Sequence, residues 1–159
     1  MNGWLRHTVW FSRALLLVAS VLFLAIASRN IVDPAAAEGP VGIAFSSPGG
    51  VTVARVGFGA FPLGFAIILI ACLVSERRLL LGLRLLNTLV VVVTAVRILG
   101  LVVDGPAAFT LKVLRPELAL TVLSTAGVYL EGKRRTRATP AEASGGLVHG
   151  LTGQVSGPS

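Results

Sequence analysis

Residues 85–103, which read LLNTLVVVVTAVRILGLVV, decide the fold. Only Arg97 is charged in this stretch, and its length matches the roughly 20 residues that a helix needs to cross about 30 Å of hydrocarbon. The unbroken valines lack the alternation of a barrel strand, and the run is too long for one strand of a soluble sheet. The stretch therefore predicts a transmembrane helix with one charge inside it.

The composition of the whole chain also indicates a membrane protein. Of the 159 residues, 54% are hydrophobic and 13% are charged, whereas soluble domains carry about 25% charged residues. Four apolar segments predict spans at about 10–28, 51–74, 79–103 and 109–130. Because only helices and closed barrels satisfy the backbone in lipid, we expect an all-α membrane protein with four transmembrane helices.

The connections between the spans predict their arrangement. Those at 75–78 and 104–108 are short, which makes the helices that they join antiparallel. The natural result is an up-down four-helix bundle covering residues 1–132. Residues 133–159 are rich in Gly, Ser, Thr, Ala and Pro, and we expect a disordered cytoplasmic tail with His149 solvated in it.

Basic residues at the span ends predict the orientation. The side with both termini holds nine: Arg6, Arg13, Arg77, Arg78, Arg84, Lys133, Arg134, Arg135 and Arg137. The other side holds five: Arg29, Arg55, Arg97, Lys112 and Arg115. The positive-inside rule then predicts a multi-pass protein of the inner (plasma) membrane with both termini cytoplasmic.

The net charge of +7 does not point to nucleic acid, because no basic residues interleave with aromatic ones and the charge lies beside the spans. The first segment also has features of a signal peptide, namely a basic start, an apolar stretch and Ala25-Ile-Ala27. Its long basic prelude favours an uncleaved helix, but the sequence leaves cleavage open.

Arg97 is expected to need a partner, since a charge at the bilayer centre costs about 2.5–3.5 kcal/mol on insertion scales. Asp104 lies seven residues on, two turns along the same helix face. Arg55 opens the second span and Glu117 lies early in the fourth, and alternating spans bring all four to the outer half. We expect a cluster of these residues in which Arg97 pairs with Asp104 or Glu117. The cluster would be either an outward-facing site for an anionic headgroup or small ligand, or a latch that fixes helix register.

Small and polar residues in the second and third spans suggest how the helices pack. Ala60 and Gly64 form a small-xxx-small pattern that permits close approach, and Pro62 is expected to kink its helix. Asn87 is expected to bridge helices, and Thr94 to bond its own helix. The residues assigned to packing or the kink are Gly57, Ala60, Pro62, Gly64 and Gly100.

The sequence predicts no catalytic residue, metal or cofactor. The predicted spans contain no histidine, and the serines lack a histidine partner. The single cysteine, Cys72, excludes an intramolecular disulfide and a cysteine metal site, and we expect it to pack or face lipid.

The motifs Arg55-Val-Gly57, Arg97 with Gly100, Asp104-Gly105 and Glu117 occur in this order. In that order they resemble the small bacterial four-helix membrane proteins classed only as a domain of unknown function, over roughly residues 9–130. The resemblance implies four helices and a shared outer polar cluster, but no activity. Two departures are Gly57-Phe-Gly59 in place of paired glycines and Pro106 directly after Gly105.

These observations favour a non-enzymatic membrane protein, either an accessory or assembly subunit or a module that binds a lipid or small ligand. Its expected partners are membrane lipids and a membrane protein or a second copy, and not nucleic acid. The alternative is a small oligomeric transporter or proton-coupled protein that uses Asp104 and Glu117.

Overall fold

The computed structural model describes the backbone of residues 3–138 and the side chains of residues 7–136, and this part of the chain is helical without strands. The long helices are α1 (Gly3–Val32), α4 (Phe61–Leu73), α5 (Leu79–Val103) and α6 (Ala108–Ala138). The short elements are α2 (Pro34–Glu38), the 3₁₀-helix η1 (Gly39–Val41), α3 (Pro48–Ala54), the π-helix η2 (Arg55–Ala60) and the 3₁₀-helix η3 (Glu76–Arg78).

Four helical stretches of the described chain are long and apolar enough to cross a membrane: His7–Val32, Pro48–Leu73, Glu76–Val103 and Ala108–Thr136. The prediction of an all-α protein with four such helices is confirmed.

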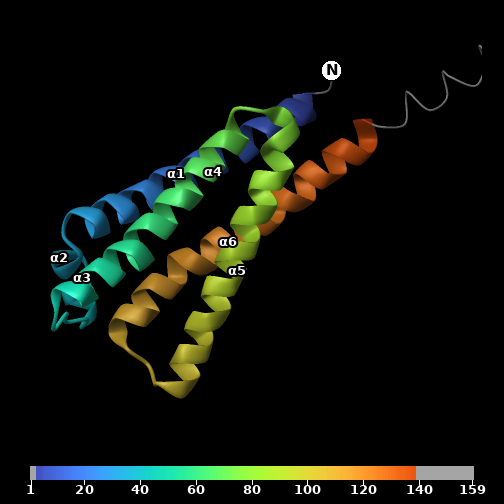
Figure 1. Ribbon diagram of the computed structural model, residues 1–159. Coiled ribbons are helices and arrows are strands. Elements are labelled where there is room, and N and C mark those ends of the chain that lie inside the picture. The colour runs from blue at the N-terminus through green and yellow to red at the C-terminus, as the bar shows by residue number, and fades with distance from the viewer. Residues whose placement is uncertain (1–2, 139–159) are drawn as a thin grey trace, which may run out of the picture.

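The helices form two hairpins (Figure 1). The first hairpin pairs α1 with the continuous stretch α3–η2–α4, and the second pairs α5 with α6. We call the end where α1 and α5 begin the terminal end, and the opposite end, with α2, α3 and the α5–α6 connection, the loop end. At the loop end Gly105 has φ +88°, a conformation that a residue with a side chain rarely adopts.

The apolar core lies toward the terminal end. Its buried residues are Leu15, Leu16, Ala19, Leu69, Leu79, Leu83, Leu86 and Val90. A Cβ on Gly82 would lie only 2.7 Å from Cys72 Cβ, so α4 and α5 approach closely there. This contact also buries Cys72 to 4% exposure.

In the second hairpin, packing decreases toward the loop end. Among the described side chains of 91–103 only Thr94 is buried, and none is buried in 108–123. Helix α5 therefore contacts mainly α6 and leans away from the first hairpin (Figure 1).

Two predicted boundaries need correction. Helix α1 reaches Val32, and Asp33 then starts α2 by accepting a hydrogen bond from Ala36 N at 3.1 Å. Helix α6 continues to Ala138, so the tail predicted from 133 starts too early, because Glu131 pairs with arginines three and four residues on. Residues 139–159, with His149, lie outside the described residues.

The interruption expected at Pro62 takes the form of a π-helix. Pro62 lies in the first turn of α4, directly after η2. A proline ring inside an α-helix clashes with the carbonyl four residues earlier and removes a hydrogen bond. A wider π turn before the proline relieves both conflicts within a continuous helical stretch.

The π-helix also changes which small residue packs against α1. Gly59 is buried, and a Cβ there would lie 2.7 Å from Ile31 Cγ1. Ala60 is exposed, and a Cβ on Gly57 or Gly64 meets no described atom of a neighbouring element within 4 Å. Within the described chain the close approach to α1 is therefore at Gly59 and not at Ala60 or Gly64, because the extra residue of the π turn rotates the helix face.

Candidate functional site

Arg97 pairs with Glu117 across the second hairpin. Arg97 Nε donates to Oε2 and Nη2 donates to Oε1 of Glu117, both at 2.7 Å. This two-bond geometry is the strongest arrangement of guanidinium and carboxylate. The two side chains are 26% and 17% exposed, so the pair is largely withdrawn from the surface.

A row of weaker polar contacts continues from this pair along the α5–α6 seam. Asn87 Oδ1 accepts from Ser124 Oγ and Thr125 Oγ1, each at 2.9 Å. Thr94 Oγ1 lies 3.2 Å from Thr121 Oγ1. The expected bridging by Asn87 is confirmed, whereas Thr94 reaches the neighbouring helix. Interhelical hydrogen bonds of this kind hold helices together where lipid provides no hydrophobic drive.

Glu117 also forms part of the wall of a cavity between the two hairpins. The cavity has a volume of about 290 Å³ and is lined by side chains from all four spans. Its walls are apolar, with Phe23 of α1, Phe61 before Pro62, and Leu120 beside Glu117. Gly57 borders it without a side chain, which keeps the space open. Glu117 is the charged residue among the described residues that line the cavity.

Arg55 and Asp104 lie apart from the Arg97–Glu117 pair. Arg55 is exposed, and its Nε donates to the carbonyl of Ile31 at 3.1 Å, which satisfies one of the last carbonyls of α1. Asp104 is the exposed C-cap of α5 and lies close to Gly100, where a Cβ would be 3.6 Å from Asp104 Oδ2. Of the four residues expected to cluster, the structure therefore brings together Arg97 and Glu117.

The antiparallel hairpin explains this choice of partner. Asp104 is about 10 Å further along the same helix axis than Arg97. Helix α6 returns alongside α5 and brings Glu117 level with Arg97.

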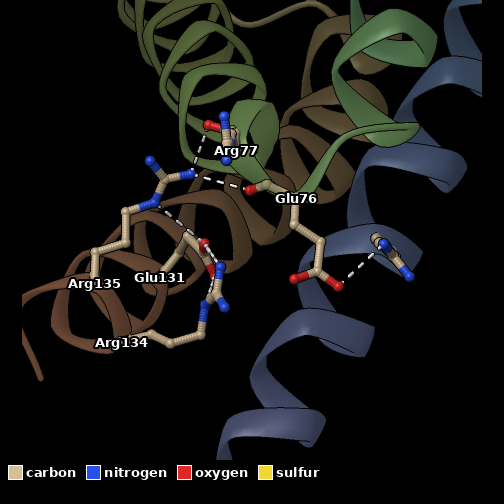
Figure 2. Close-up of polar contacts among 6 residues, drawn as sticks. Glu76, Arg77, Glu131, Arg134 and Arg135 are labelled. Carbon is tan, nitrogen blue, oxygen red and sulfur yellow. Dashed lines mark hydrogen bonds and ion pairs between the residues drawn. The ribbon is translucent and has the colours of Figure 1, made fainter. Parts of the chain in front are cut away.

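A second polar cluster at the terminal end was not predicted (Figure 2). Glu131 is fully buried and accepts from Arg134 Nε at 2.9 Å and from Arg134 Nη2 at 2.5 Å. Arg135 Nε donates to the same carboxylate at 3.4 Å.

This cluster joins two helices, α1 and α6, to the turn η3. Arg135 Nη2 donates to the carbonyls of Glu76 and Arg77 at 3.1 and 2.8 Å. The Glu76 carboxylate pairs with Arg13 of α1 at 3.4 Å. We call the set Arg13, Glu76, Glu131, Arg134 and Arg135 the terminal clamp. The sequence signal for it was Glu131 followed by arginines at the helical spacings of three and four.

Neither polar cluster is a candidate metal centre. The described residues contain no group of three or more His, Cys, Asp or Glu side chains able to hold a metal ion. Comparison with protein-family models, curated proteins and solved structures finds no match for this chain. The resemblance to the bacterial four-helix proteins therefore stays a prediction.

Proposed function

We propose that the protein is a non-enzymatic multi-pass membrane protein that binds a small apolar ligand, such as a single-chain amphiphile, in the cavity between its hairpins. The main support is the composition of that cavity, whose apolar walls come from all four spans and include one carboxylate. Apolar surface alone means little in a membrane protein. A partly enclosed apolar space with a fixed polar group is, by contrast, the usual composition of a small-molecule site.

The geometry of Glu117 suggests the polar part of the ligand. Arg97 gives one N–H to each carboxylate oxygen, and each oxygen can accept about one bond more. A ligand hydroxyl or ammonium group would fit this acceptor. An anionic headgroup fits less well, because Glu117 and not Arg97 is among the residues that line the cavity.

We further propose that the terminal end faces the cytoplasm and that the membrane is a bacterial inner membrane. The support is the excess of arginine and lysine at the terminal end. In that orientation the cavity lies near the middle of the bilayer.

Native mass spectrometry of the full chain in a mild detergent, followed by lipid analysis, tests the binding function. Val93 lines the cavity, whereas its neighbour Val92 is 54% exposed and lies outside it. We expect wild type and Val92→Phe to retain a bound small molecule, and Val93→Phe to lose it because the ring fills the space.

A bare monomer in all three samples would overturn the proposal. If a second protein stays bound to the chain and the Val93→Phe substitution does not release it, the accessory or assembly role is favoured instead. Glu117→Gln provides a finer comparison, since loss of the charge should weaken an ammonium ligand strongly and a hydroxyl ligand only slightly.

A further inference from the structure

The described basic side chains at the terminal end fall into two groups. Arg13, Arg134 and Arg135 are engaged with Glu76 or Glu131 in the terminal clamp. The second group is exposed and consists of Arg77, Arg78, Arg84 and Lys133. The other acidic side chains of the described chain, Asp33, Glu38, Asp104 and Glu117, belong to the half with the loop end. The exposed group therefore carries uncompensated positive charge.

Arg84 lies inside a span and not at its edge. It follows Arg78 by six residues, which is about 9 Å along the axis of α5. Leu81, nearly one turn before it, and Leu85, directly after it, are 54% and 36% exposed. A charge exposed among leucines at this depth is costly in lipid unless its head reaches a polar partner.

The direction of helical side chains tells where that partner would lie. Cα–Cβ bonds tilt toward the helix N-terminus, which for α5 is the terminal end. The apolar stem of Arg84 can therefore lie over the leucines while its guanidinium extends toward the headgroups at that end.

Arg77 lies in the 3₁₀-helix η3, seven residues before Arg84, and both side chains are exposed. The backbone that carries it is fixed, because Arg135 Nη2 donates to the carbonyls of both Glu76 and Arg77 (Figure 2). The neighbouring Glu76 carboxylate is bound to Arg13. The backbone of Arg77 is thus held in place by Arg135, and the adjacent acidic side chain, Glu76, is already paired with Arg13.

We propose that Arg77 and Arg84 bind the phosphate of an anionic phospholipid in the leaflet at the terminal end, with an acyl chain along Leu81 and Leu85. The planar guanidinium matches phosphate oxygens well. Arg78 and Lys133 add positive charge around the site, which favours anionic over zwitterionic headgroups. None of the residues of this site lines the cavity, and the site does not depend on the function proposed above.

Titration of the full chain in detergent with phosphatidylglycerol or phosphatidylcholine of equal chain length, read by native mass spectrometry, tests the site. Wild type should prefer phosphatidylglycerol. Arg77→Gln and Arg84→Gln should each weaken its binding about fivefold, and the double variant should abolish the preference. Arg84→Lys should keep part of it. The matched control Arg29→Gln/Arg115→Gln removes the same charge from exposed positions near the loop end and should leave the preference intact.

Circular dichroism of each variant establishes that the helices are retained. Equal affinity of wild type for the two lipids, or equal loss in the control pair, would overturn the proposal. Displacement of phosphatidylglycerol by excess inorganic phosphate would assign the site to a free anion and overturn it as a lipid site. Val93→Phe should not change the preference, and if it did, the lipid would be bound in the cavity and the proposed site would be wrong.

Discussion

Each half of the bundle contains a glutamate that is largely shielded from the surface and bound by arginine. The surroundings of the two glutamates differ. At the terminal end Glu131 is fully buried, bound by two arginines, and lies next to the closely packed core. At the loop end Glu117 is bound by one arginine and is part of a cavity wall. An arginine–glutamate pair can therefore be part of a closely packed region in one half of a helical bundle. In the other half, a pair of the same kind lies beside a cavity.

Gly82 in the core and Gly57 at the cavity show the same difference. Gly82 lies where α4 and α5 nearly touch, and Gly57 lies where a side chain would meet open space. The two ends should consequently respond very differently to equivalent substitutions.

The largest effect is expected for Glu131→Leu. This change leaves Arg134 and Arg135 without their shared carboxylate, and loss of one partner of a buried ion pair costs about 3–5 kcal/mol. Reversible unfolding in mixed detergent micelles, followed by circular dichroism, measures it. The control Glu76→Gln breaks the exposed pair with Arg13 and should cost less than about 1 kcal/mol. Similar losses in both variants would contradict the central role of Glu131.

Glu117→Leu should cost about 2–3 kcal/mol, less than Glu131→Leu, because the Arg97–Glu117 pair is partly exposed. The double variant Arg97→Leu/Glu117→Leu should recover most of this loss, since no unpaired charge remains. The same unfolding assay measures the stability of the single and double variants. If the double variant is as unstable as the sum of the single ones, the two residues do not act as a pair.

The sequence was sufficient for the four spans because hydropathy and length decide them, but it could not fix the partner of Arg97. Spacing along one helix favoured Asp104, and only the register of the α5–α6 hairpin selects Glu117. Glu131 was missed because the predicted span ended at 130, although its spacing to Arg134 and Arg135 was visible.

The π-helix could not be predicted from the sequence either. Pro62 requires some relief of its clash, and both a kink and a π turn provide it. The choice between them decides which face of the helix meets α1, so Gly59 could not be distinguished in advance from Ala60 or Gly64.

Paired glycine substitutions give the next largest effect. Gly82→Ala should destabilise by about 1–3 kcal/mol, because the new Cβ would lie 2.7 Å from Cys72 Cβ, which cannot rotate away. Gly57→Ala should be neutral or stabilise by up to about 1 kcal/mol through helix propensity. Midpoints of thermal unfolding in one detergent compare the two. Equal destabilisation by both would show that the ends are packed alike.

The smallest effect is expected for Asn87→Val, which removes the acceptor shared by Ser124 and Thr125. Hydrogen bonds between membrane helices contribute about 0.6 kcal/mol on average and up to about 1.7. The unfolding assay should place this loss below that of Glu117→Leu. A larger loss would make the polar seam, and not the ion pair, the main contact between α5 and α6.

The burial of Cys72 makes the chain a natural background for thiol labelling. The single thiol is enclosed where α4 meets α5, so a membrane-impermeant maleimide should react with it very slowly. A reporter cysteine at exposed Ser46 or Arg78 would then dominate the signal without removal of the native one. Labelling of intact cells at one reporter and not the other would reveal which end of the bundle faces outward.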